Sequence, residues 1–100
     1  MKILAISKRP PGATADRLAA LAVDEAARVW ALQCAGTIRE IYFCAERPAA
    51  VVILECADGA EAQDILATLP MVEAGVLDFD ILPLQPFDHY ERLFRDEFRR

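Results

Sequence analysis

The chain has 100 residues, of which 55% are hydrophobic, so it is long enough to bury one core and too short for a two-domain enzyme. Its 16 acidic and 11 basic residues give a formal net charge of −5, the wrong sign for a protein that neutralises nucleic acid phosphates or binds an anionic membrane. We therefore expect one domain with neither nucleic acid nor membrane as a partner.

The cysteines and the N-terminus indicate a reducing compartment. The cysteines, Cys34, Cys44 and Cys56, are odd in number and too widely spaced for a CxxC pair, so neither a disulfide framework nor a zinc site is expected. The first apolar run, residues 3–6, is too short for a signal peptide or a membrane span. We expect a cytoplasmic protein without a metal.

The N-terminal half predicts a strand followed by a long helix. Residues 2–7 form a short apolar run that ends in a segment with two prolines and a glycine, which suits a strand and a loop. A helix over about residues 14–35 follows, because the segment is rich in Ala and Leu, begins with Thr14 as a capping residue and ends before Gly36.

The second half predicts two strands, a helix and a last strand. Residues 37–44 and 49–56 are rich in β-branched and aromatic side chains and are joined by a short turn containing Pro48. Asp58 is the expected N-cap of a second helix that Pro70 stops. Apolar and acidic residues alternate over residues 77–81, which is typical of a strand with one apolar face.

This order of elements predicts an α+β, ferredoxin-like βαββαβ fold, in which two helices cover one face of a four-stranded antiparallel sheet. The other face would be bare and largely apolar, so we expect a homodimer that forms a dimeric α+β barrel and could assemble further. Residues 1–86 would form the domain. Residues 87–100 would form a helical C-terminal tail that docks on a partner subunit through Phe87, Leu93, Phe94 and Phe98.

Glu25 is the most unusual residue of the first helix. A projection at 100° per residue places it within the apolar stripe formed by Leu18, Leu21, Ala22, Val29 and Leu32. A carboxylate among apolar groups has a raised pKa, which suits it to accept and return a proton near neutral pH. The alternatives are that Glu25 reaches the helix edge, or pairs with Arg28 or Arg39.

Three residues of the predicted sheet are further candidates. Arg39 could bind a substrate carboxylate through its planar guanidinium, or pair with an acidic residue. Asp78 and Asp80 share one face of the last strand, so they are substrate-binding candidates if that face lies under a dimer seam, and ordinary surface charges if it faces water.

Two aromatic side chains could border a substrate. His89, the single histidine, could contact substrate or shuttle a proton if the tail covers a pocket mouth, although a histidine in a tail is more often exposed. Trp30 could line an apolar pocket together with Tyr42 and Phe79, or all three could belong to the core. Nucleotide-binding and serine hydrolase motifs are absent.

Several short segments together resemble a known family: Asp24-Glu25, Gly36-Thr37-Ile38-Arg39, Glu61-Ala62, Leu69-Pro70 and Asp78-Phe79-Asp80. Over residues 20–85 the sequence resembles muconolactone delta-isomerase and its relatives. The resemblance implies a ferredoxin-like fold, barrel dimers and a cofactor-free shift of a double bond in a small unsaturated lactone. Such a shift needs a base beside a carbonyl and a donor that holds the developing enolate.

The resemblance makes Glu25 the candidate base and Arg39 and Tyr42 the candidate enolate stabilisers. Substrate contacts would come from Asp78, Asp80, His89 and Trp30. Two alternatives stay open: a non-catalytic ligand-binding or assembly module on the same dimer, and a cofactor-independent monooxygenase-like barrel.

Overall fold

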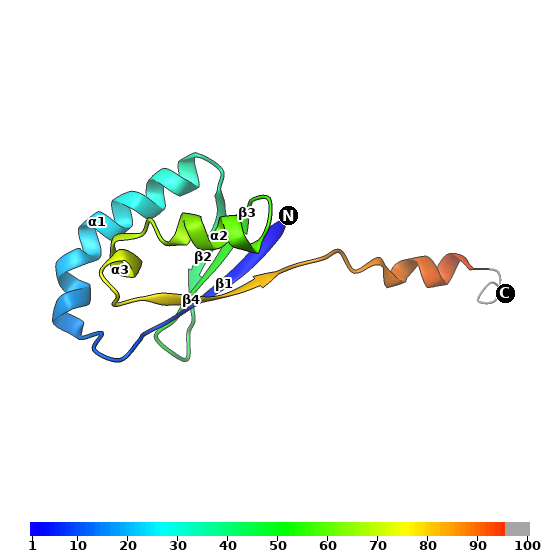
Figure 1. Cartoon of the computed structure of the whole chain (residues 1–100). Coiled ribbons are helices and arrows are strands. Elements are labelled where there is room, and N and C mark those ends of the chain that lie inside the picture. Colours follow the sequence, from blue (N-terminus) through cyan, green and yellow to red (C-terminus); the bar gives the residue numbers. More distant parts are fainter. Residues whose placement is uncertain (96–100) are drawn as a thin grey trace.

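The computed structural model describes residues 1–95 and has one antiparallel sheet in the order β2-β3-β1-β4. Helices α1 and α2 lie over the same face of this sheet (Figure 1). The predicted α+β ferredoxin-like fold is therefore confirmed. The elements in chain order are β1 (Lys2–Lys8), α1 (Ala15–Cys34), β2 (Ile38–Phe43), β3 (Ala50–Glu55), α2 (Gly59–Leu66), α3 (Pro70–Glu73), β4 (Asp78–Pro83) and a 3-10 helix (Asp88–Phe94).

The predicted boundaries of α1 are confirmed to within one residue. Thr14 caps the helix, since its Oγ1 accepts the Arg17 N–H at 3.3 Å. After the helix, Gly36 adopts a φ of 80°, a left-handed conformation that costs glycine little. These two local signals fix where the chain enters and leaves the helix.

The second predicted helix is shorter than expected. Asp58 does cap α2, with Oδ1 accepting the Glu61 N–H at 2.9 Å, but the helix ends at Leu66. Pro70 does not stop it and instead opens α3 at its first position. A proline suits this position because its missing N–H would have no partner within the helix.

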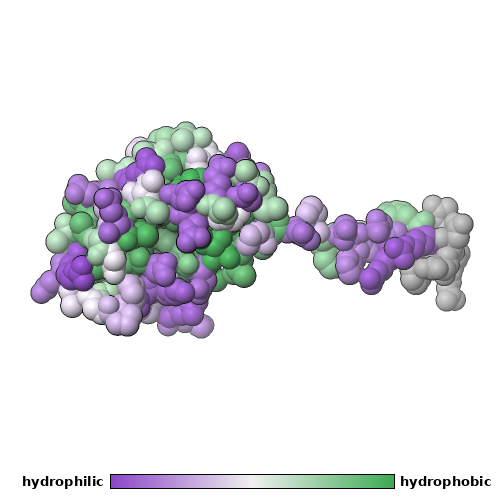
Figure 2. All heavy atoms as spheres, in the orientation of Figure 1, coloured by the Kyte–Doolittle hydropathy of each residue, from purple (hydrophilic) through white to green (hydrophobic). Residues whose placement is uncertain are grey.

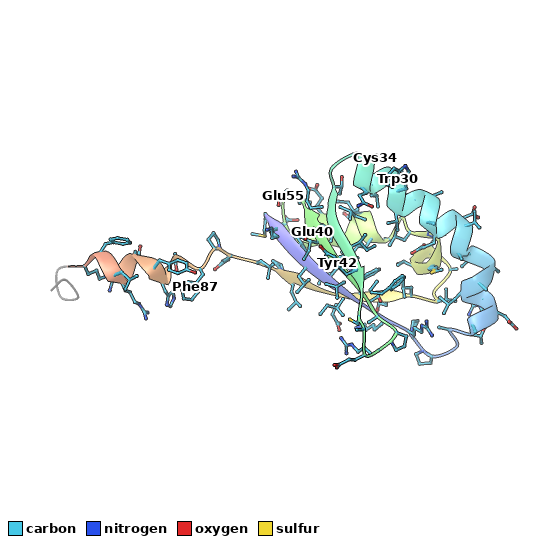
Figure 3. All side chains as sticks on the ribbon, turned by 180° about the vertical axis from the view of Figure 1, so that it is seen from behind. Trp30, Cys34, Glu40, Tyr42, Glu55 and Phe87 are labelled. Atoms are coloured by element: carbon cyan, nitrogen blue, oxygen red, sulfur yellow. The ribbon has the colours of Figure 1, made fainter. Side chains whose placement is uncertain are left out.

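The core lies between the helices and the two central strands. Ile3 and Leu54 are fully buried there, and Leu32 of α1 and Leu66 of α2 pack on the same cluster. On the opposite face, Leu4 pairs with Ile53 and Ile6 pairs with Val51, and all four side chains are only half buried. Figure 3, seen from behind, shows no helix over this face within the described residues.

A β-bulge decides which side chains of β2 face the helices. Ile38 pairs with Leu54 and Glu40 with the next residue, Ile53, so Arg39 is an extra residue without a partner in the ladder. The bulge shifts the alternation by one position. Ile41 therefore joins Ile38 on the helix side, while Tyr42 pairs with Val51 on the bare face.

The chain after β4 leaves the body as an extended segment and a 3-10 helix (Figure 1), and the molecule measures 62 × 29 × 21 Å. Hydrophobic atoms lie beside hydrophilic ones on this tail (Figure 2). Its Phe87, Leu93 and Phe94 are each more than 60% exposed. Within the described part of the tail, Asp88–Phe94 form a 3-10 helix. That residues 87–100 dock on a partner subunit stays a prediction, and Phe98, also expected to dock there, lies outside the described residues.

Candidate functional site

A cavity of about 660 Å³ lies between α1, α3 and the sheet. Its walls are largely apolar and come from α1, α2, α3 and all four strands; the apolar residues include Leu18, Val29, Ile41, Val52, Leu69 and Phe79. The sequence predicts a pocket at this place, between the first helix and the sheet. An apolar cavity with few polar groups is the usual form of a small-molecule site.

Glu25 is the carboxylate of this cavity. It is half buried in the wall formed by α1, and its Oε1 accepts the backbone N–H of Met71 at 3.0 Å. Burial raises the pKa of Glu25 above its ordinary value, and the hydrogen bond from Met71 opposes that rise without cancelling it. The side chain is thereby prepared to bind and release a proton.

No cation pairs with Glu25 among residues 1–95. Arg28 Nε donates to Thr68 Oγ1 at 3.0 Å, and Arg39 Nε donates to the carbonyl oxygen of Gly36 at 2.6 Å. The ion pairs that could have made Glu25 a purely structural residue are therefore absent from this part of the chain. Desolvation, and not a neighbouring charge, dominates its electrostatics.

The other two predicted catalytic residues are placed differently. Tyr42 lines the edge of the cavity, is 59% exposed and donates its hydroxyl to Glu40 Oε1 at 2.8 Å. That hydrogen bond raises the pKa of Tyr42. Arg39 is the unpaired residue of the bulge, is exposed and does not line the cavity. The structure thus brings Glu25 and Tyr42 to one cavity and leaves Arg39 outside it.

The four predicted substrate contacts lie outside the cavity of a single chain. Asp78 and Asp80 lie on the bare side of the sheet. Asp80 Oδ1 accepts a hydrogen bond from Lys8 Nζ at 2.7 Å, and Asp78 Oδ1 accepts the backbone N–H of Phe79. His89 stacks on Phe87 in the tail. Trp30, near the end of α1 (Figure 3), is 66% exposed. Five positions on an α-helix turn the chain by about 140°, so Trp30 points away from Glu25, and it is not among the residues that line the cavity of a single chain.

The sequence reasoning missed three polar residues of the cavity: Ser7, Arg9 and Arg47. Ser7 ends the inward face of β1, Arg9 follows that strand, and Arg47 lies in the turn between β2 and β3. They meet because β3 pairs with β1, which brings that turn beside the end of β1. No short sequence motif encodes such a meeting. The one available signal was that Ser7 is a polar residue at the end of an apolar strand.

The described residues contain no group of three or more His, Cys, Asp or Glu side chains that could hold a metal ion. Separately, none of the helices in residues 1–95 is both long and apolar enough to cross a membrane.

The family model for muconolactone delta-isomerase matches residues 3–90, which include all of the sheet except Lys2, all the helices that cover it and Glu25. The chain belongs to the muconolactone delta-isomerase family. One similar solved structure is 5-chloro-2-hydroxyhydroquinone dehydrochlorinase from Burkholderia phenoliruptrix in complex with 2,5-dihydroxybenzoquinone. It is 16% identical, with a TM-score of 0.67 over 89% of this chain and 98% of that chain, and so shares the fold. No curated protein sequence matches significantly.

Proposed function

We propose that this protein is a cofactor-free isomerase that moves a double bond in a small unsaturated lactone or a similar carbonyl compound, with Glu25 as the base. The observation that carries the proposal is a half-buried carboxylate without a cationic partner, placed in the wall of an apolar cavity. Membership of the muconolactone delta-isomerase family supports the same reaction type. A binding module would have no need for a desolvated carboxylate beside its ligand.

The proposed reaction needs one base and no co-reactant. Glu25 takes a proton from the carbon next to the substrate's conjugated carbonyl system, and the electron pair of that C–H bond moves toward the carbonyl oxygen to give a dienolate. The protonated Glu25 then returns the proton to another carbon of the dienolate. The double bond ends in a new position and the enzyme is restored, so atoms and electrons balance.

One carboxyl oxygen of Glu25 is fixed by a hydrogen bond and the other is available to take up and return a proton. The Met71 N–H binds Oε1, which fixes the carboxyl group and leaves Oε2 without a partner among the described residues. Tyr42 remains the proposed donor to the enolate oxygen. Its side chain lies on the bare face and its hydroxyl is bonded to Glu40, so this role requires the side chain to turn toward the cavity edge and to exchange that bond for one to the substrate. Arg39 has no part in the proposal, because it lies outside the cavity.

The cavity has ample room for a substrate of one ring. Its volume of about 660 Å³ lies within the range of ordinary ligand sites. The dehydrochlorinase with the same fold was solved with 2,5-dihydroxybenzoquinone, a single-ring carbonyl compound. A small unsaturated lactone is of similar size.

The active form is proposed to be a homodimer in the cytoplasm. Two bare sheet faces would cover each other, and the tail of each chain would dock on its partner through exposed aromatic groups such as Phe87 and Phe94. The cysteines Cys34, Cys44 and Cys56 carry free thiols, which fits a reducing compartment.

Deuterium exchange tests the base directly. Candidate unsaturated lactones are incubated with the protein in D₂O, and loss of the transferable proton and appearance of the isomer are followed by NMR. We expect Glu25→Gln to slow both by roughly 10²- to 10⁴-fold, and Asp24→Asn, an exposed neighbour on the same helix, to leave them unchanged. Equal exchange rates in Glu25→Gln and wild type would remove Glu25 as the base.

A further inference from the structure

Side-chain hydrogen bonds tie α1 to the segment of residues 68–74, which contains α3 and lies beside α1 (Figure 1). Within residues 1–95 there are three such bonds, and in order along α1 they join Arg17 to Ala74, Glu25 to Met71 and Arg28 to Thr68. Residue numbers rise along α1 as they fall along the segment, so the two run antiparallel. The proposed base makes the middle contact, and arginines make the contacts on either side of it.

The Met71 N–H depends on Glu25 for its acceptor. Met71 is in the first turn of α3, where backbone donors have no acceptor within the helix. Leu69, the N-cap residue of α3, makes no side-chain hydrogen bond to this turn. Glu25 supplies the missing acceptor from α1. How well the carboxylate is bound therefore depends on where residues 68–71 hold this N–H.

Thr68 fixes the segment three residues before Met71. Its Oγ1 donates to the carbonyl oxygen of Ile65 at 2.6 Å and accepts the Arg28 Nε–H at 3.0 Å. A hydroxyl that donates and accepts at once has a fixed orientation. The next residue, Leu69, is only 2% exposed and anchors the segment in the core, but apolar burial has no direction. The bond from Arg28 is the directional link between α1 and this end of the segment.

We propose that Arg28 and Thr68 are positioning residues for the base: their hydrogen bond holds residues 68–71 so that the Met71 N–H stays aimed at Glu25 Oε1. Neither of the two lines the cavity, so they act on the site only through Met71 and Glu25. The inference deepens the proposed function and rests on it for the claim that Glu25 carries the transferred proton.

The hydrogen bond from Met71 has a direct effect on the acidity of Glu25. Burial raises the pKa of Glu25, and the Met71 N–H opposes that rise. The other charged or titratable groups of the elements around Glu25 make no hydrogen bond or ion pair with it within residues 1–95; they are Arg9, Tyr42, Cys44 and Arg47 in the cavity, Asp24 and Arg28 on α1, Glu73 on α3, and Arg39 and Glu40 on β2. Misplacement of Met71 should therefore raise the pKa of Glu25 further.

Carbon-13 NMR titration of the Glu25 carboxyl group tests the inference on the free protein, with the signal assigned by its loss in Glu25→Gln. Thr68→Val keeps the side-chain shape and every charge, and should raise the pKa of Glu25 by about 0.5 to 1 unit. Thr68→Ser keeps the hydroxyl and should restore the wild-type value. Thr37→Val, beyond the end of α1 and outside the cavity, is the matched control and should change nothing.

A double-mutant cycle separates positioning from a direct effect of the arginine charge. Arg28→Gln alone should raise the pKa of Glu25 as Thr68→Val does. In the Thr68→Val background it should add nearly nothing, because the link is already broken. A full additional rise would mean that the Arg28 charge acts on Glu25 through space, and would overturn the inference.

The outcomes also separate this inference from the proposed function. An unchanged pKa of Glu25 in Thr68→Val means that apolar packing alone holds Met71, and overturns the positioning role whatever the protein catalyses. If the pKa shifts as expected but no lactone is isomerised, the isomerase proposal fails and the positioning role stands. Where turnover is found, Thr68→Val should move the rising limb of the pH profile of kcat to higher pH and leave KM nearly unchanged.

Discussion

Replacement of Glu25 by Gln should make the protein more stable at neutral pH and leave its stability unchanged in acid. Gln keeps the shape of the side chain and an oxygen that can accept the Met71 N–H. It removes only the charge, and that charge is desolvated in the wall of the cavity. The usual expectation for an enzyme variant, a loss of stability, is therefore reversed here.

The raised pKa of Glu25 explains why the variant should be the more stable protein at neutral pH. The folded chain holds the Glu25 proton more tightly than the unfolded chain, whose pKa is near the ordinary value of 4.5. The protonated Glu25 therefore contributes to the free energy of unfolding of the wild type. This contribution is fully present below pH 4.5 and is lost as the pH rises through the pKa that Glu25 has in the folded state. Over that window the wild type should lose up to about 1.4 kcal/mol per pH unit relative to Glu25→Gln. In a domain of this size, 1 kcal/mol corresponds to roughly 4–8 °C in Tm.

Urea denaturation followed by circular dichroism, from pH 4 to pH 8 at fixed protein concentration and ionic strength, measures the difference. Asp24→Asn is the control, because it removes the same charge from an exposed position on the same helix. The pH at which the Glu25 curves stop diverging reports the pKa of the folded state. If the wild type instead gained stability over Glu25→Gln as the pH rose, the ionised carboxylate would be stabilised by a partner and the desolvation argument would be wrong.

Three further changes test the fold and the assembly. Leu54→Ala removes a fully buried side chain and should lower the free energy of unfolding by about 2–5 kcal/mol in urea titrations; a loss below 1 kcal/mol would contradict its central place in the core. Asp58→Ala removes the cap of α2 and should cost about 1 kcal/mol, with Asp64→Ala on the same helix as control. Deletion of residues 87–100 should weaken the proposed dimer in sedimentation experiments; an unchanged dimer would reject docking by the tail, and a monomeric full-length chain would reject the dimer.

The features that sequence predicted correctly are those with local causes. The limits of α1 follow from Thr14 and Gly36, and the inward position of Glu25 follows from helical geometry alone. The features it missed depend on how distant segments meet. Arg9 and Arg47 become neighbours only through the pairing of β1 with β3, and the use of Pro70 to open a helix depends on where the preceding turn leaves the chain.

The bulge in β2 decides which of its side chains face the cavity and which face the bare side of the sheet. Without it, strict alternation from Ile38 would place Glu40 and Tyr42 toward the helices and would put a carboxylate into the core. With Arg39 set aside, apolar Ile41 takes the inward position, and Tyr42 stands on the bare face while still reaching the cavity edge. In the proposed dimer, a second sheet would cover the Tyr42–Glu40 pair and exclude water from it. The hydroxyl proposed to hold the enolate would then depend on the partner subunit, so weakening of the dimer should lower turnover as well as molecular mass.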